Sequence, residues 1–413
     1  MSPRGRILRG WLAAAGAAAA IAGCQERLTA PVDCPALCPG GSADVFDTVL
    51  TALPGADSSY QGYIEGGSGI SLLVSNGLPV SENRALYRFG PRPDSVIVGA
   101  TGATDTVPYV VDSVLLSLNL LARDTLTDGL KVYFYRIAST VESGITFPEL
   151  ASQLVEPNLI DSVAVADTLN TGTVQLVLRG TDALKTGLPA DAGGTLAIGI
   201  AISAAAPTGV RLGSTGGGTG ATFASYVTAQ GVADTVTGRQ QTITRTPAFN
   251  TFVSETPLVP DPALLTVGGE PSSRALLRFD LPDRLEDSAD IVRATLELVP
   301  SVPVLGLPTD PSLIVAKAVL ADLGAKSPVT TDNTFWATDT LTPGVSDTVR
   351  LDVTNLVRLW QSTATERPEA IFVSLLPEAA TFMRAQFGST RSPEVGAPRL
   401  RVTYLLAFPF ENP

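Results

Sequence analysis

Three cysteines are the residues with the clearest potential chemistry in this chain of 413 residues. Two of them, Cys34 and Cys38, enclose only Pro35, Ala36 and Leu37. This spacing differs from the CxxC of redox sites, and no further ligand types cluster nearby to complete a metal site. We therefore predict a Cys34–Cys38 disulfide formed in an oxidising compartment. Its short loop limits how much it adds to stability.

The third cysteine, Cys24, ends an apolar run that begins near Ile7, and three arginines, Arg4, Arg6 and Arg9, lie at its start. A cationic start, a short apolar core and small residues before a cleavage point are typical of a signal peptide. The run from Trp11 to Ala22 is too short and too rich in alanine to cross ~30 Å of hydrocarbon. We therefore predict that residues 1–23 are a signal peptide and not a membrane anchor.

The stretch Ile21-Ala22-Gly23-Cys24 resembles the lipobox of bacterial lipoproteins. The resemblance implies that Cys24 is diacylated, that the chain is cleaved before it, and that the new amine is acylated. An Asp after the cysteine would resemble the inner-membrane retention signal of some Gram-negative bacteria, but this chain has Gln25. The expected location is the cell envelope, lipid-anchored in the outer membrane on its periplasmic or surface face.

Histidine is absent from the chain, which excludes Ser-His-Asp and Cys-His nucleophile systems and histidine-ligated zinc. Carboxylate-pair hydrolysis and chemistry based on Tyr or Lys are the catalytic arrangements that remain. Glu65, Glu82 and Glu297 are available for a carboxylate pair, but nothing in their spacing places two at a catalytic separation. A polysaccharide-degrading enzyme, either a carboxylate-pair hydrolase or a lyase, is therefore the alternative function.

Charge and composition restrict the partners further. The formal net charge is −12, and removal of residues 1–23 takes away three arginines and no acidic residue. Such a surface repels phosphate backbones, so nucleic acid is not an expected partner. The chain is 45% apolar and 16% charged, which suits a soluble body of two domains with real cores.

Aspartates that precede Thr-Val or Thr-Leu suggest one metal hypothesis. Carboxylates on loops are ligands for calcium, but Asp also closes turns by bonding its own backbone before a strand begins. Because no Asp-x-Asp-x-Asp run concentrates ligands, we favour the turn interpretation and expect no cofactor, with calcium as the alternative. The aspartates are Asp47, Asp105, Asp124, Asp167, Asp234, Asp339 and Asp347.

Two tryptophans in the second half of the chain are the candidate ligand platforms. Val353, Leu356, Val357 and Trp360 follow the spacing of one apolar helix face, which predicts a short helix with Trp360 in the core. Asp352 or Thr354 can cap its start.

Trp336 lies beside Phe335 in a polar stretch. Core packing is the simpler interpretation of Trp336, but its ring also suits a sugar. We keep Trp336 as the candidate ligand-binding residue.

The elements that position these residues are almost all strands, because short alternating runs recur between Gly, Pro, Asp and Asn. The run Arg84–Phe89 matches Arg274–Phe279 at five of six positions, and later runs follow in the same order. This indicates two copies of one β-domain. We place a linker at 24–45 and the copies at 46–230 and 243–406.

Strand parity in the repeated run indicates which side faces the core. Ala275, Leu277 and Phe279 share the expected core face, and Arg274 and Arg278 the opposite one, where they can pair with acids. In copy one we expect a weaker helix at Thr181–Leu188 and a flexible hairpin loop at Gly216–Gly220, which lacks the Lys of a phosphate loop.

Five segments of the second copy resemble the DNRLRE domain of bacterial surface proteins, which is similar in turn to jelly-roll carbohydrate-binding modules. They occur in the family's order over about 245–406, while copy one keeps Arg84–Phe89 but lacks both tryptophans. The resemblance implies a sandwich of about nine strands with a binding or structural role. The segments are Arg274–Pro282, Ile291–Leu298, Trp336, Asp352–Trp360 and Gly396–Val402.

Together these observations predict an all-β protein. Two tandem jelly-roll-type antiparallel sandwiches follow a lipoprotein signal peptide and a short linker. The expected function is non-catalytic binding or structure at the cell envelope, with a polysaccharide or an envelope protein as partner and the membrane held through Cys24.

Overall fold

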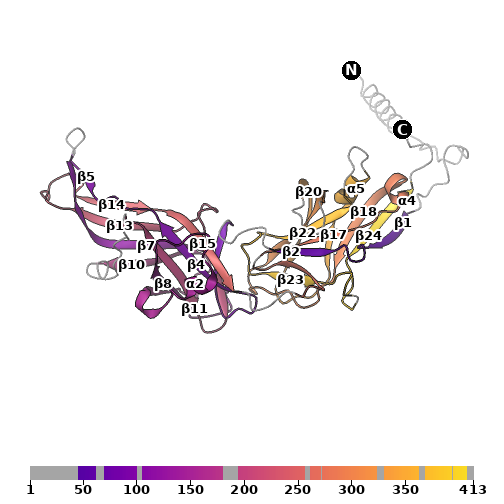
Figure 1. The fold of residues 1–413 in the computed structure, drawn as a ribbon, viewed down its shortest axis with the longest axis horizontal. Helices are drawn as coiled ribbons and strands as arrows, with labels where there is room; N and C mark the ends of the chain where they lie inside the picture. Colours follow the sequence, from indigo (N-terminus) through magenta and orange to yellow (C-terminus); the bar gives the residue numbers. More distant parts are fainter. Residues whose placement is uncertain are drawn as a thin grey trace, which may run out of the picture. The chain divides into compact units, whose positions relative to one another are not determined.

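The computed structural model is an all-β protein that contains two sandwiches, which confirms the predicted fold class (Figure 1). It describes residues 45–61, 69–99, 105–179, 194–255, 261–270, 272–322, 330–361, 368–392 and 394–406. The predicted signal peptide and nearly all of the linker lie outside these ranges, as does the helix expected at Thr181–Leu188.

Sandwich one consists of two antiparallel sheets. One has the strand order β14-β13-β7-β12-β3, with β10 paired to β7, and the other has the order β15-β4-β11-β8-β9. A two-stranded sheet, β5-β6, lies beside them. The strands are β3 Ser71–Asn76, β4 Glu82–Phe89, β5 Val96–Val98, β6 Asp105–Val107, β7 Tyr109–Arg123, β8 Lys131–Ile137, β9 Leu159–Ala164, β10 Gly172–Arg179, β11 Leu196–Ser203, β12 Thr208–Gly213, β13 Thr222–Ala229, β14 Gln240–Arg245 and β15 Pro247–Glu255.

Sandwich two also consists of two sheets. Their orders are β1-β24-β18-β21 and β20-β19-β22-β17-β16-β23, with β2 paired to β17. The strands are β1 Val45–Thr51, β2 Ser58–Gln61, β16 Leu265–Gly268, β17 Ser273–Arg278, β18 Ala289–Leu298, β19 Ser312–Ala321, β20 Thr330–Leu341, β21 Val349–Asp352, β22 Ala370–Leu376, β23 Arg384–Phe387 and β24 Arg399–Leu406.

Each core is built by alternation along the strands. In β7, Val114, Leu116, Leu118 and Leu120 are buried while the residues between them are half-buried. This is the period-two pattern of a strand that faces a core on one side. In β17 the predicted face is confirmed, because Ala275, Leu277 and the following Phe279 belong to the core of sandwich two.

The helix predicted beside Trp360 is confirmed as α5, Thr354–Trp360. Leu356, Val357 and Trp360 are buried, and the Trp360 ring lies 6.3 Å from that of Phe279. Core packing is therefore the correct interpretation of Trp360.

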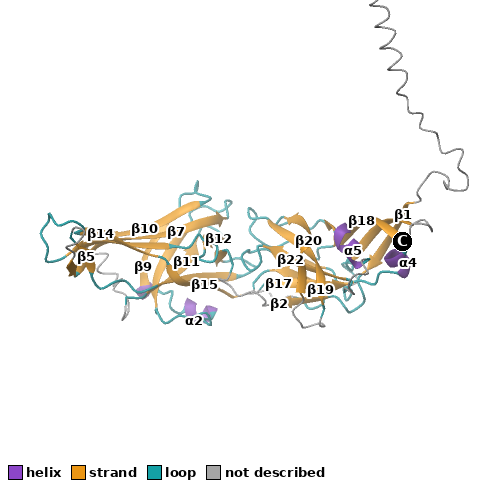
Figure 2. Ribbon diagram, turned by 90° about the horizontal axis from the view of Figure 1, so that it is seen from above, coloured by secondary structure: helices purple, strands orange, loops and turns teal. Residues whose placement is uncertain are grey.

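The other short helices lie outside the sheets (Figure 2). They are α2 Phe147–Ala151, η2 Glu156–Asn158 and α4 Asp283–Asp287. Leu150 of α2 and the nearby Leu154 approach Gly199 of β11, where a Cβ would lie 2.5 Å from Leu154. A side chain at this position would therefore require the end of the Leu154 side chain to move.

The sheets do not follow the predicted boundary between the copies. Residues 45–61 form β1 and β2, which pair in sandwich two, and residues 240–255 form β14 and β15, which pair in sandwich one. Figure 1 shows the indigo β2 among the orange strands of sandwich two. Order along the chain predicted the division at 46–230 and 243–406, but hydrogen bonding between distant strands decides which sheet each one joins.

The two sandwiches contact each other through loops of sandwich two. Phe382 and Leu307 belong to the core cluster of sandwich one. Arg211 of β12 donates to Asp310, with 2.8 Å between the Arg Nη2 and Asp Oδ1 atoms. Asp310 is 7% exposed, so this ion pair is mostly withdrawn from solvent.

Candidate functional site

Trp336 lies on β20, at the edge of the larger sheet of sandwich two. Its side chain is 51% exposed, so the packing interpretation is wrong. The reason is strand parity: the next residue, Ala337, belongs to the core, and Trp336 therefore points to the opposite face.

A row of side chains crosses this outer face. Trp336 is opposite Lys317 of β19, Lys317 is opposite Phe372 of β22, and Phe372 is opposite Leu276 of β17. Residues that are directly opposite in a ladder share a face. Trp336 thus lies at the exposed end of a row whose inner members, Phe372 and Leu276, are buried.

A hollow of about 290 Å³ lies beside the Trp336 ring. Its lining mixes apolar and polar groups from three strands. The lining residues are Val315, Lys317, Asn333, Trp336, Ser374, Leu375, Leu376 and Glu378.

The polar groups of this hollow are held in place by neighbours. The Lys317 Nζ donates to the Asn333 Oδ1 at 2.9 Å. Glu378 accepts from Arg274, with 3.0 Å between the Arg Nη2 and the Glu Oε2, and the Arg274 guanidinium lies 5.2 Å from the Phe372 ring centroid. The hollow therefore offers an aromatic face beside an ammonium group, an amide and a carboxylate in constrained positions.

The two arginines of the repeated run pair with acids, as strand parity predicts. Arg274 bonds Glu378, and Arg278 bonds both carboxylate oxygens of Asp322, with 2.9 Å between Nη2 and Oδ1. The hydrogen bonds that Arg278 donates to Asp322 raise the pKa of the Arg278 guanidinium. These charges are engaged within the fold and do not form a separate ligand-binding stripe.

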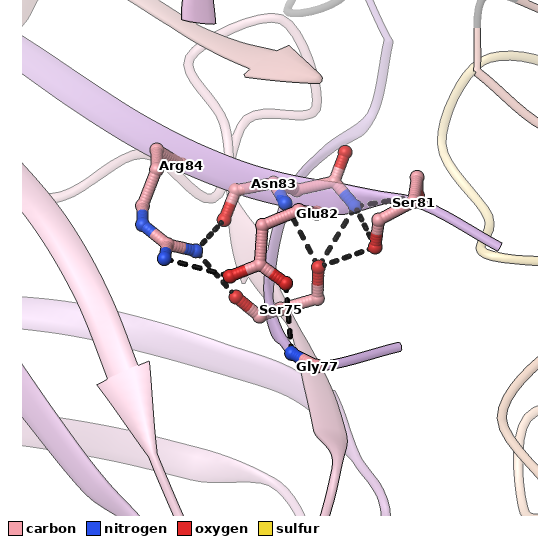
Figure 3. A network of polar contacts seen from close by, with 6 residues as sticks. All are labelled: Ser75, Gly77, Ser81, Glu82, Asn83 and Arg84. Carbon is pink, nitrogen blue, oxygen red and sulfur yellow. Dashed lines mark hydrogen bonds and ion pairs between the residues drawn. The ribbon is translucent and has the colours of Figure 1, made fainter. Parts of the chain in front are cut away.

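The candidate catalytic acids are not brought together. Glu65 lies outside the described residues. Glu82, on β4 of sandwich one, forms an ion pair with Arg84 and accepts from the Gly77 N–H at 2.8 Å (Figure 3). Glu297 lies on β18 of sandwich two, 3.5 Å from Arg350.

The Asp-Thr aspartates that the structure describes act within turns and strands. Asp124 accepts from the backbone N–H of Leu126 at 2.9 Å, and Asp339 from that of Thr340 at 2.7 Å. Asp47 accepts from Arg401 across the β1–β24 pair. Within the described residues, no group of three or more acidic or cysteine side chains is placed to hold a metal ion.

Cys24, Cys34 and Cys38 lie outside the described residues, so lipidation and the disulfide stay predictions. Gly216–Gly220 lies in the connection between β12 and β13. No helix in the described part of the chain is long and apolar enough to cross a membrane.

Lys317, Asn333 and Glu378 were not predicted as site residues. Alternation in the run Leu313–Val319 could have placed Lys317 on the outer face. No sequence signal places Asn333 or Glu378 beside it, because these contacts depend on strand pairing and on the turn after β22.

A scan against protein-family models and a search of curated proteins found no match for this chain. The resemblance to the DNRLRE domain therefore stays a prediction.

Proposed function

We propose that this chain is a lipid-anchored, non-catalytic binding protein of the cell envelope, and that sandwich two binds a polysaccharide at the Trp336 hollow. The exposed Trp336 ring is the observation that supports this proposal. The apolar face of a pyranose stacks on an aromatic ring, while its hydroxyls exchange hydrogen bonds with groups such as Lys317, Asn333 and Glu378. The DNRLRE resemblance favours the same role.

The glycan proposal is tested with Trp336→Ala. Loss of the ring removes the stacking surface and leaves the sheet intact, so we expect at least a tenfold weaker affinity, about 1.4 kcal/mol. A glycan array with and without calcium identifies the ligand, and titration calorimetry measures the affinity of each variant.

Tyr226→Ala is the matched control, because Tyr226 is a similarly exposed aromatic on sandwich one, 42% accessible. Its affinity should equal that of the unmodified protein. Equal affinities for all three proteins would rule out the Trp336 hollow as the site. Failure of every glycan to bind would favour an envelope protein as the partner.

The anchor is tested with Cys24→Ser. A serine cannot form the thioether to diacylglycerol, so we expect loss of labelling by radioactive palmitate and release of the protein from the membrane fraction. Cys34→Ser is the control and should keep the label. Label that persists in Cys24→Ser would contradict lipidation at this residue.

A further inference from the structure

Most strand pairings of sandwich one have a counterpart in sandwich two. The pair β3-β12 differs in its sheet, because β12 pairs with β7 in sandwich one whereas β16 pairs with β17 in sandwich two, and β5-β6 occurs in sandwich one alone among the described strands. The pairs correspond as follows: β7-β10 with β18-β21, β7-β13 with β18-β24, β4-β11 with β17-β22, β11-β8 with β22-β19, β8-β9 with β19-β20, β3-β12 with β16-β23, β13-β14 with β24-β1, and β4-β15 with β17-β2.

The last two correspondences cross between the copies. By their position in the repeat, β1 and β2 are the first strands of copy one, and β14 and β15 the first strands of copy two. The structure pairs β1 and β2 with sandwich two, and β14 and β15 with sandwich one.

The register of the crossed strands is the same in both sandwiches. Ala85 of β4 is opposite Phe252 of β15, and Ala275 of β17 is opposite Ser59 of β2. Ala85 and Ala275 occupy the same position in the repeated run. Ser59 and Phe252 are therefore equivalent residues, each seated in the sandwich of the other copy.

An equivalent hydrogen bond joins a loop to the exchanged strand segment in each sandwich. Thr215 donates through its backbone N–H to the Oδ1 of Asn250 in β15, at 2.9 Å. Thr390 donates in the same way to the Asp57 Oδ2 at 2.8 Å, just before β2. Asn250 and Asp57 are equivalent residues, because each lies two positions before the equivalent residues Phe252 and Ser59. The same hydrogen bond therefore occurs in both sandwiches, and in each the acceptor comes from the other copy.

We propose that the two copies have exchanged their first two strands within one chain. We also propose that the difference between Phe252 and Ser59, which occupy equivalent positions, selects this pairing. Phe252 is 4% exposed in the core of sandwich one. Ser59 instead accepts a hydrogen bond from the Thr266 N–H at 2.8 Å in sandwich two. Without the exchange, Ser59 would take the position of Phe252 in sandwich one and leave a cavity in its core. Phe252 would take the position of Ser59 in sandwich two, where its phenyl ring would be crowded.

A polar network at the start of β4 also favours β15 as its neighbour. Asn83 donates to Ser75 and Ser81, and its Oδ1 accepts from Ser254 of β15 (Figure 3 shows Asn83, Ser75 and Ser81). In sandwich two the positions of Asn83 and Ser254 are occupied by Ser273 and Gln61. The side chains that meet at this position therefore differ between the two sandwiches.

The exchange determines to which sandwich the predicted linker at 24–45 is joined. The chain before Val45 leads into β1, so it is joined to sandwich two, which also carries Trp336. Sandwich one, formed by 71–255, is then an insertion between β2 and β16. A force applied through the predicted lipid anchor at Cys24 would act on sandwich two before sandwich one.

Two cysteine pairs in the full-length protein test the exchange. Ser59→Cys is combined either with Ala275→Cys or with Ala85→Cys, and each protein is unfolded, refolded in a glutathione redox buffer and mapped by mass spectrometry of unreduced peptides. We expect the 59–275 bridge within one chain, at least tenfold more abundant than the 59–85 bridge.

A 59–85 bridge of equal or greater abundance would overturn the exchange. A 59–275 bridge found only in disulfide-linked dimers would overturn its intramolecular form. Absence of both bridges, while a Phe252→Cys and Ala85→Cys protein forms its own, would also overturn it.

Selection by Phe252 is tested by adding Phe252→Ala to the Ser59→Cys and Ala85→Cys protein. The 59–85 bridge should rise several-fold, because the cavity penalty of the unexchanged pairing disappears. Phe223→Ala is the matched control, since Phe223 is a buried phenyl of the same core on β13. An equal rise in both variants would overturn selection by residue 252. Phe252→Leu replaces Phe252→Ala if the latter does not fold.

Discussion

At the scale of single residues, burial changes the chemistry of groups that composition alone leaves ordinary. Glu270 follows β16 and is 6% exposed. Burial raises the pKa of its carboxyl group to about 8, because an apolar surrounding disfavours the charged form. The adjacent Gly269 lies against the side chain of Arg384, whose pKa burial lowers. At neutral pH the folded protein therefore holds Glu270 protonated.

Glu270 should make stability fall as the pH rises. The folded protein keeps a proton that the unfolded chain releases above about pH 4.5, so the free energy of unfolding decreases between pH 4.5 and 8 by at most about 1.4 kcal/mol per pH unit. Urea denaturation at pH 5 and pH 8 measures the difference. Glu270→Gln should remove most of it, whereas Glu255→Gln, at an exposed strand end, should keep it. Identical pH dependence in the unmodified protein and Glu270→Gln would contradict this assignment.

At the scale of elements, α5 shows how a short helix is held in a β-protein. Asp352 accepts from the Thr354 backbone N–H at 3.1 Å and from its hydroxyl at 2.6 Å. The Thr354 hydroxyl and backbone N–H lower the pKa of Asp352. The N-cap position is occupied by Val353, which makes no side-chain cap hydrogen bond, so the predicted capping by Asp352 or Thr354 is not found there. Seven residues form too short a helix to be stable alone, so the Asp352 hydrogen bonds to Thr354 and the burial of Trp360 together maintain it.

Asp352→Ala should destabilise the protein by about 1 kcal/mol, the usual net contribution of an intramolecular hydrogen bond. Because the folded pKa of Asp352 is lowered, its contribution is present above the unfolded pKa and is lost as the pH falls through the folded pKa. Thermal unfolding at pH 7 and pH 3 measures this. Asp352→Asn, which keeps an acceptor, should retain most of the stability at pH 7. A deficit of equal size at both pH values would argue against a contribution from the Asp352 carboxylate.

Local sequence patterns predicted some of these elements and not others. Alternation placed the core faces of the strands and the helix at Val353–Trp360 because each periodicity reports one element by itself. Core packing was the simpler interpretation of Trp336 because its immediate neighbours, Phe335 and Ala337, are apolar and hide the alternation there. Its exposure depends on β20 being an edge strand, which no local pattern reports.

At the scale of the whole described chain, the two sandwiches are joined by contacts as well as by peptide bonds. Phe382 enters the core of sandwich one, and Gly209 must be glycine-sized because a Cβ there would lie 2.9 Å from the Phe382 ring. Arg211 and Asp310 form a mostly buried ion pair beside it. Burial raises the pKa of Asp310, and Arg211 lowers it.

Asp310→Ala should destabilise the protein, because it leaves the Arg211 charge partly buried without its partner. The loss of one partner of a buried pair costs about 3–5 kcal/mol, and we expect the lower end because the Arg211 side chain is 19% exposed. Chemical denaturation measures the change. Arg211→Met combined with Asp310→Leu should recover most of the stability. A double variant as unstable as Asp310→Ala would show that the contact is not electrostatic.

The all-β class, the core faces and the helix beside Trp360 could be predicted from the chain alone, and so could the repeated run, because periodicity and local repeats depend on residues that are close in sequence. The choice of neighbouring strands could not be predicted: β1 and β2 complete sandwich two, and β14 and β15 complete sandwich one. Strands pair through backbone hydrogen bonds, which are nearly the same for every residue, so local sequence does not distinguish one partner strand from another. The choice between two equivalent partners is therefore made by distant side chains such as Phe252 and Ser59.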